Sequence, residues 1–182
     1  MNGIEKTVKK TYKFKGKIFN VRQDDALTCD GRPCTREVIE HNGGVSILAL
    51  TKGNLLLVSQ YRYPLEKTLT ELPAGKLEKG ERPLDCARRE LLEETGYEAE
   101  RFTLLDISYP SPGCMEEIHY IYFAEGLTFK GQHLDEDEFL DVEKIPFEKA
   151  LKMVMDNEIT DAKTQIGILK LDKILSGGKN LD

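Results

Sequence analysis

The segment from Glu81 to Thr95 combines strong helix signals with a high density of acidic side chains. Pro83 suits the first turn of a helix, and Gly96 suits a left-handed C-terminal cap. The sequence therefore predicts a helix over about residues 83 to 95. Few other parts of the chain constrain the fold as strongly, because this helix must keep its acids hydrated or give them a cation.

The acidic residues of this helix are not spread evenly around it. At about 100° per residue, Glu90, Glu93 and Glu94 project within roughly a third of the helix circumference. The apolar members fall on a neighbouring stripe, Leu84, Ala87 and Leu91. The helix can therefore pack one side on a sheet and hold three carboxylates at the edge of a cleft.

Two interpretations of this acidic face compete. Clustered carboxylates repel one another, and hard oxygen ligands of this kind suit Mg²⁺ or Mn²⁺ rather than zinc. The alternative is a solvated helix face with ordinary ion pairs, such as Arg89 with Glu93 at i, i+4. The three acids alone favour the solvated face, so the residues around them have to decide.

The segment from Gly75 to Tyr97 resembles the Nudix box at every fixed position of that motif. The pattern is Gly, five residues, Glu, seven residues, then Arg-Glu-U-x-Glu-Glu-x-Gly-U, where U is bulky and apolar. Its fixed residues here are Gly75, Glu81, Arg89, Glu90, Leu91, Glu93, Glu94, Gly96 and Tyr97. So many matches at fixed spacing overturn the solvated-face interpretation.

The resemblance implies a Nudix hydrolase of α+β class, an α/β/α sandwich with a mixed β-sheet between helices. It implies that Glu93 and Glu94, and often Glu90, bind Mg²⁺, for which Mn²⁺ substitutes, with the Ala74 carbonyl as a further ligand. Arg89 would orient a glutamate. The physical logic agrees, because divalent ions neutralise developing charge on phosphoryl groups and activate a bound water.

The flanks of the box resemble the ADP-ribose pyrophosphatase subgroup over about residues 15 to 155. Pro112 lies sixteen residues beyond Gly96, as a proline does in that subgroup. Further matching segments, in the same order, are Thr35 to Val38, Ser59 to Pro64, Glu71 to Gly75 and Asp135 to Glu138. The resemblance implies ADP-ribose as substrate and marks Pro112 as a substrate-site residue.

The substrate contacts follow from the same segments. Arg36 and Arg62 are candidate diphosphate-binding residues, because guanidinium groups suit phosphate oxygens and can stack on a base. Glu71 resembles a subgroup residue that positions substrate or metal. An aromatic wall is expected for the adenine, and the available residues are Phe19, Tyr61 and Tyr63.

The catalytic base stays a choice among several acids. Glu93 in the box is one candidate, and Glu136 or Glu138 in the later acidic run are others. Glu117 aligns with the acid of the subgroup's Pro-Gly-x-x-Asp-Glu pattern. This chain departs from that pattern with Cys114-Met115-Glu116, where small or polar residues and Asp are usual.

The rest of the chain divides into an N-terminal arm and the hydrolase domain. Residues 12 to 41 read as antiparallel strands with a turn at Cys29–Pro33, so we expect a β-arm over residues 1–42 and a Nudix domain over 43–182. The domain should contain a hairpin around residues 51–53, strands near 68–72, 102–107 and 118–129, and helices at 147–155 and 162–175. In the resembled subgroup the arm exchanges between subunits, which implies a homodimer.

Composition excludes several other classes of protein. The formal net charge of −6 argues against a broad nucleic-acid-binding surface. The longest apolar runs are too short to cross a bilayer, and no secretory signal is expected after the basic N-terminus, so we expect a cytoplasmic protein without membrane contact. Four cysteines without a CxxC pair and three scattered histidines give no zinc site.

The sequence thus predicts an Mg²⁺-dependent hydrolase that cuts ADP-ribose, a small nucleotide substrate, to AMP and ribose 5-phosphate with a metal-activated water. One alternative is a broader nucleotide-sugar or nucleoside diphosphate pyrophosphatase, since no residue marks the sugar end. Another is a non-catalytic Nudix module that senses ADP-ribose. The intact acids of the box favour an enzyme.

Overall fold

Two neighbouring strands, β4 (Gly44–Thr51) and β5 (Asn54–Arg62), are apolar on both faces and form the middle of a sheet. They pair antiparallel through a two-residue turn in which Lys52 and Gly53 both have positive φ, 49° and 77°. Such a turn matches the right-handed twist of the strands it joins. The predicted hairpin is therefore confirmed.

A computed structural model describes residues 3–134 and 139–177 and falls into two compact units. We call residues 1–43 with 109–118 the arm unit, and residues 44–108 with 119–182 the core unit. The sequence placed residues 109–118 in the hydrolase domain, whereas their contacts group them with the arm.

The sheet of the core unit is mixed. Its main path runs β10-β5-β4-β9-β8, with β6 beside β5 and β7 beside β4. The β4–β9 pair is parallel and the other pairs are antiparallel. The further strands are β6 (Lys67–Glu71), β7 (Ala74–Lys76), β8 (Tyr97–Ser108), β9 (His119–Phe129) and β10 (Leu140–Pro146).

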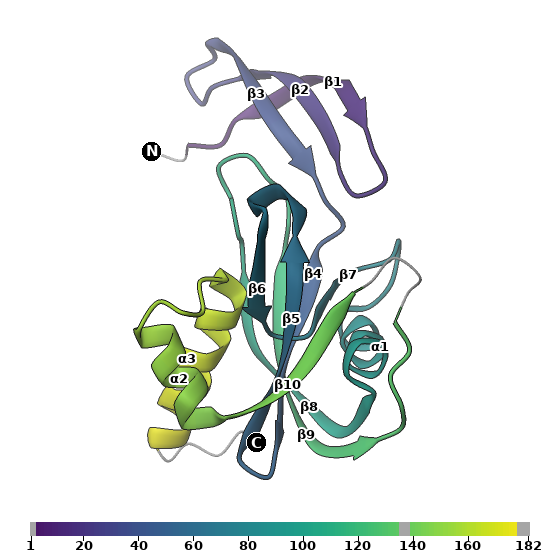
Figure 1. Ribbon diagram of the computed structural model, residues 1–182. Coiled ribbons are helices and arrows are strands. Elements are labelled where there is room, and N and C mark those ends of the chain that lie inside the picture. The colour runs from purple at the N-terminus through teal and green to yellow at the C-terminus, as the bar shows by residue number, and fades with distance from the viewer. Residues whose placement is uncertain (1–2, 135–138, 178–182) are drawn as a thin grey trace. The chain divides into compact units, whose positions relative to one another are not determined.

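Helices cover both faces of this sheet, as Figure 1 shows. On one face, Val45, Ile47 and Leu56 pack with Cys86, Ala87 and Leu91 of α1 (Pro83–Thr95). On the other face, Leu48, Leu55 and Leu57 pack with α2 (Phe147–Met155) and α3 (Ala162–Ser176). Because side chains alternate across a strand, two apolar faces require two helical layers. The predicted α/β/α sandwich is confirmed.

The arm unit is an antiparallel three-stranded sheet in the order β1-β2-β3. Its strands are β1 (Lys6–Lys15), β2 (Asn20–Leu27) and β3 (Pro33–Glu40). The segment 109–118 joins this unit through backbone bonds from Ile39 N to the Cys114 carbonyl, 2.7 Å, and from Glu116 N to the Ile39 carbonyl, 3.0 Å.

The helices and the strands predicted near 68–72 and 118–129 lie within one residue of their predicted bounds, whereas several other strands differ from the prediction. Helix α2 begins and ends at the predicted residues, whereas β1 begins at Lys6 rather than near residue 12. The strands β7 and β10 were not predicted, and β8 starts directly after Gly96 instead of at Phe102.

Within residues 3–134 and 139–177, no helix is long and apolar enough to cross a membrane. A short 3₁₀ turn, η1 (Tyr63–Leu65), follows β5.

Candidate active site

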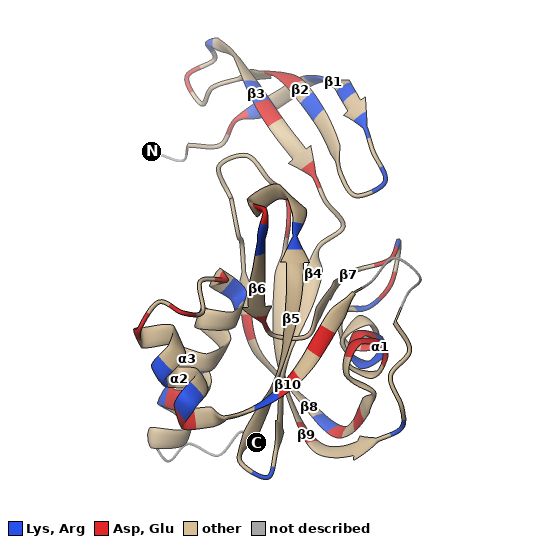
Figure 2. Cartoon of the chain, in the orientation of Figure 1, with Lys and Arg blue, Asp and Glu red and all other residues tan. Residues whose placement is uncertain are grey.

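The three acids of α1 differ in burial. Glu90 and Glu94 are buried, at 7% and 2% relative exposure, whereas the Glu93 side chain is 33% exposed. Figure 2 shows both acidic and basic residues on this helix. The face is therefore not an ordinary solvated one, because a carboxylate rarely gives up its hydration without compensating partners.

Strand β7 supplies the partners behind this face. The backbone N–H of Ala74 donates to Glu94 Oε2 at 2.8 Å. The neighbouring Gly75 lies so close to Glu90 that a Cβ atom there would fall 1.8 Å from Glu90 Oε1. Strand β7 is itself held by β4, where Ser46 pairs with Ala74. The glycine that opens the Nudix box thus leaves room for a box carboxylate.

Arg89 forms hydrogen bonds with three carboxylates of this site. Its Nε and Nη2 each donate to Glu81 at 3.0 Å, and its Nη1 donates to Glu90 Oε1 at 2.8 Å and Glu93 Oε2 at 3.0 Å. Nη2 also contacts the Lys76 carbonyl at 3.3 Å. The i, i+4 pair with Glu93 exists, but it is one contact in a network of three carboxylates.

The network shifts the ionisation of its members. The Arg89 hydrogen bonds outweigh the opposing effect of burial and lower the pKa of Glu81 to about 2. The same bonds to Glu81, against the cost of burial, raise the pKa of Arg89. Glu81 and Arg89 are therefore a charged pair at all physiological pH values.

The chemistry of this donor set fits a hard divalent cation. Glu90 Oε1 and Glu93 Oε2 already converge on one cationic nitrogen, Arg89 Nη1. Within the described ranges, 3–134 and 139–177, no three acidic, histidine or cysteine side chains are close enough to form a ready-made metal cage. Mg²⁺ does not need one, because it is usually bound by one or two carboxylates together with waters and substrate phosphates.

A second charged cluster lies at the end of β6. Glu71 is 1% exposed, and Arg62 donates to both of its oxygens, at 2.6 and 2.7 Å. Lys163 of α3 also contacts Glu71 and pairs with Asp161 at 2.9 Å. Burial opposes ionisation of Glu71, but these two cations together hold its pKa below the ordinary value. Arg62 and Glu71, both predicted from the sequence, are thus brought into contact.

Lys163 and Asp161 were not predicted as site residues. They follow Glu71 by some ninety residues, and only the fold brings them to it. The local signal was a helix start: Asp161 caps α3 by accepting from Thr164 N at 3.0 Å. The Thr164 hydroxyl in turn accepts from Leu72 N at 2.9 Å, which fastens α3 to the strand end that carries Glu71.

The remaining predicted residues lie in the arm unit or outside the described residues. Arg36 is exposed on β3 and pairs with Glu5. Pro112 and Glu117 lie on the 109–118 segment. Glu136 and Glu138 fall outside the described residues.

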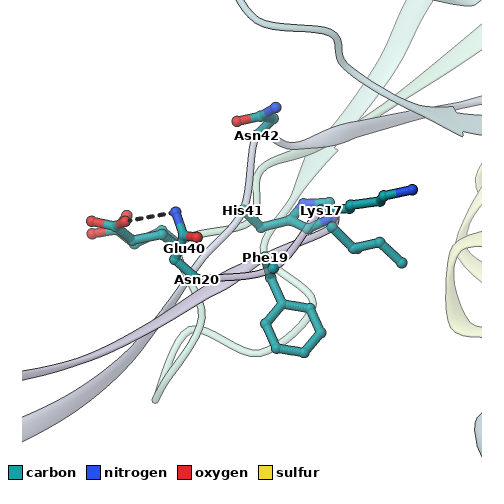
Figure 3. Close-up of a pocket in the computed structure, with 9 residues that line it drawn as sticks. Lys17, Phe19, Asn20, Glu40, His41 and Asn42 are labelled. Carbon is teal, nitrogen blue, oxygen red and sulfur yellow. Dashed lines mark hydrogen bonds between the residues drawn. The ribbon is translucent and has the colours of Figure 1, made fainter. Parts of the chain in front are cut away.

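The candidate adenine-contacting residues are divided between the units. Phe19 lines a polar pocket of about 380 Å³ in the arm unit, together with Asn20, Glu40 and His41 (Figure 3). Tyr61 and Tyr63 are exposed in the core unit, Tyr61 at the end of β5 and Tyr63 in η1. All three aromatic side chains are exposed, and their contact with the adenine stays a prediction.

Comparison with known proteins agrees with this site. The family description "NUDIX domain" matches residues 40–164. An ADP-ribose pyrophosphatase of Bacillus subtilis (strain 168) is 43% identical over 96% of this chain and 97% of its own length. A methanol dehydrogenase activator of Bacillus methanolicus is 43% identical over 90% of each chain. A crystal structure titled as an ADP compounds hydrolase has the same fold, with a TM-score of 0.84, 21% identity and 96% of both chains covered.

The Gly75 to Tyr97 motif, the family match and these relatives agree on one class of protein. The chain belongs to the Nudix family and is a Nudix hydrolase. Enzymes of this family generally use divalent metal ions. The predicted resemblance to ADP-ribose pyrophosphatases is confirmed.

The close approach of Gly75 to Glu90 can be tested by adding one methyl group. We expect Gly75→Ala to displace the Glu90 carboxylate and to lower the free energy of unfolding by about 1–3 kcal/mol. Gly3→Ala is the control, since no atom lies within 4 Å of a Cβ there. Chemical denaturation measures both variants, and equal stability of Gly75→Ala and wild type would contradict the packing.

The Glu81–Arg89 pair should make stability depend on pH. Folding lowers the pKa of Glu81 from 4.5 to about 2, so its contribution is complete above pH 4.5 and is lost as the pH falls towards 2. We expect Glu81→Gln to be less stable than wild type at pH 7, with the difference shrinking between pH 4.5 and 2. Urea unfolding at a series of pH values measures this, and a constant difference would be evidence against the pair.

Proposed function

We propose that this Nudix hydrolase cuts the pyrophosphate of ADP-ribose to AMP and ribose 5-phosphate, with Mg²⁺ as cofactor and Mn²⁺ able to substitute. The observation that carries the proposal is the carboxylate face of α1, where Glu90 and Glu93 contact Arg89 and the buried Glu94 accepts from Ala74 N. The similarity to an ADP-ribose pyrophosphatase over nearly the whole chain supports the substrate.

The proposed roles follow from the charges of the site residues. The carboxylates of Glu90, Glu93 and Glu94, with the Ala74 carbonyl, would hold the metal, and Arg89 keeps Glu90 and Glu93 oriented toward one point. A bound divalent ion neutralises charge on the diphosphate and lowers the pKa of a coordinated water. Glu93, Glu117 and Glu138 stay the candidates for the base that takes a proton from the attacking water.

Arg62 is the proposed diphosphate-binding residue of the core unit. Its side chain is 38% exposed, and Glu71 accepts from its Nε and one terminal nitrogen. Its other terminal nitrogen has no hydrogen-bond partner among the described residues, and a guanidinium held in this way suits phosphate oxygens. Glu71 therefore acts as the anchor of Arg62. Arg36 and Pro112 are the proposed substrate contacts of the arm unit.

Two alternatives share the same site. The first is a broader nucleotide-sugar or nucleoside diphosphate pyrophosphatase, because two relatives of equal identity carry different names and identity alone does not choose the substrate. The second is a module that binds ADP-ribose without cutting it. A homodimer in the cytoplasm, without nucleic-acid or membrane partners, stays a prediction.

A substrate panel tests the proposal directly. The purified chain is incubated with Mg²⁺ and, separately, ADP-ribose, nucleotide sugars, dinucleoside polyphosphates, NADH and nucleoside triphosphates, and products are separated by chromatography. We expect AMP and ribose 5-phosphate, with the highest kcat/KM for ADP-ribose. Faster turnover of another panel member would replace the substrate, and binding without turnover would identify a sensing module.

The proposed metal-binding carboxylates can be tested by Glu→Gln changes, which remove the charge and keep the size of the side chain. We expect Glu93→Gln and Glu94→Gln each to lower kcat at least about 100-fold while the fold is retained. Glu148→Gln, exposed at the start of α2 on the opposite side of the sheet, is the matched control and should keep wild-type activity. A chelator should abolish wild-type turnover and excess Mg²⁺ should restore it. Unchanged turnover of both site variants would remove the metal assignment.

A further inference from the structure

A buried arginine organises the arm unit. Arg22 on β2 is 5% exposed, and its guanidinium contacts three carboxylates from three separate segments. Its Nε donates to Asp24 at 2.9 Å, its Nη1 to Glu40 of β3 at 2.5 Å, and its Nη2 to Glu116 of the 109–118 segment at 2.6 Å. Each nitrogen therefore has a different partner.

This geometry suits arginine and no other side chain. A guanidinium is planar and presents its donors in a fixed fork, whereas the ammonium of lysine is a single point charge on a flexible stem. Only the fork can hold three carboxylates at three fixed directions at once. The contacts also tie positions 18 and 94 residues apart in sequence, so no local preference enforces them.

The segment that Arg22 reaches is already structured by its backbone. The amides of Cys114 and Met115 both donate to the Ser111 carbonyl, at 3.1 and 2.9 Å, which closes a turn. The Ile39 N–H donates to the Cys114 carbonyl, and the Ile39 carbonyl accepts from the Glu116 N–H. Ile39 also forms a parallel bridge with Met115. The Arg22–Glu116 pair adds a side-chain tie at the end of the segment, directly before Glu117.

The same guanidinium forms hydrogen bonds with two of the acids that line the pocket in Figure 3. Glu40 and Glu116 both line this pocket, and both accept hydrogen bonds from Arg22. Asn20 donates to the second oxygen of Glu40 at 3.4 Å, and Tyr12 donates to the first at 3.0 Å. The two acids of the pocket therefore have fixed positions that depend on one residue.

We propose that Arg22 is a positioning residue for the hydrolytic reaction. Through Glu116 it fixes the segment that carries Pro112 and Glu117, and through Glu40 it fixes the wall of the pocket beside Phe19. The inference rests on the proposed function for its kinetic readout, because Pro112 is a proposed substrate contact and Glu117 a candidate base. Arg22 itself touches no substrate in this scheme.

The test begins with the exposed partner, so that folding is preserved. The Glu116 side chain is 48% exposed, and Glu116→Ala leaves Arg22 bonded to Asp24 and Glu40. We expect hydrogen–deuterium exchange over residues 109–118 to become at least about 10-fold faster, and kcat to fall roughly 10- to 100-fold, with little change in melting temperature. Arg32→Gln, an exposed arginine of the same unit paired only with its neighbour Asp30 in the described residues, should change neither readout.

Arg22→Lys separates geometry from charge. A residue that only balanced charge would be replaced well by lysine, whereas a positioning fork would not, so we expect the loss seen in Glu116→Ala to recur. The double variant Arg22→Lys with Glu116→Ala should fall no further than the more impaired single variant, because Arg22→Lys already breaks the tie that Glu116→Ala removes. Multiplied losses in the double variant would overturn the proposal, as would wild-type kcat in both single variants.

The exchange measurement keeps this test separate from the substrate assignment. If the wild type cuts another panel member instead of ADP-ribose, the proposed substrate fails, and the same variants are measured on that member. Faster exchange with unchanged kcat overturns the positioning role, and lower kcat with unchanged exchange overturns the tie as its cause. Faster exchange with lower kcat supports both.

Discussion

The burial of two carboxylates on one face of α1 is the constraint on which the site depends. Removing an ionised carboxylate from water costs several kcal/mol unless hydrogen bonds and an opposite charge compensate it. Glu94 receives a backbone N–H from Ala74, and Glu90 receives Arg89. The absence of a side chain at Gly75 makes room for this arrangement. A like-charged face held so firmly favours any cation that approaches it from the open side.

The sandwich explains why this face can be rigid. Alternate residues of β4 and β5 anchor α1 on one side and α3 on the other, so the helix that carries the acids rests on a packed core.

Both ends of helix α1 are also fixed. Pro83 begins it, and Gly96 ends it with φ of 74° and a bond to the Leu92 carbonyl. The segment after β9 covers the same end, where Gln132 donates to the Glu94 carbonyl and His133 N to that of Glu93. Catalytic geometry on rigid elements is held more closely than on loops.

How much of this was predictable depends on the range of the interactions. The bounds of α1, its cap at Gly96 and the hairpin turn at Lys52–Gly53 follow from local preferences, so the sequence predicted them well. The motif also named the acids and Arg89, because their spacing is a property of one helix. Strands β7 and β10 escaped prediction, since a three-residue strand has no periodicity and Leu140–Pro146 is mostly exposed. Lys163 and Arg22 escaped it because their partners lie far away in the chain.

Three arginines each hold a cluster of acidic side chains in this protein. Arg89 joins carboxylates within the box, Arg62 is held by Glu71, and Arg22 joins β2, β3 and the 109–118 segment. The residues of the Arg89 cluster belong to one short motif, and this motif accounts for the chemistry that Nudix hydrolases share. The second cluster adds Lys163 from far along the chain, and the third joins segments up to 94 residues apart. A complete box therefore identifies the reaction while leaving the sugar end of the substrate open, because a motif of one helix does not describe clusters that only the fold assembles.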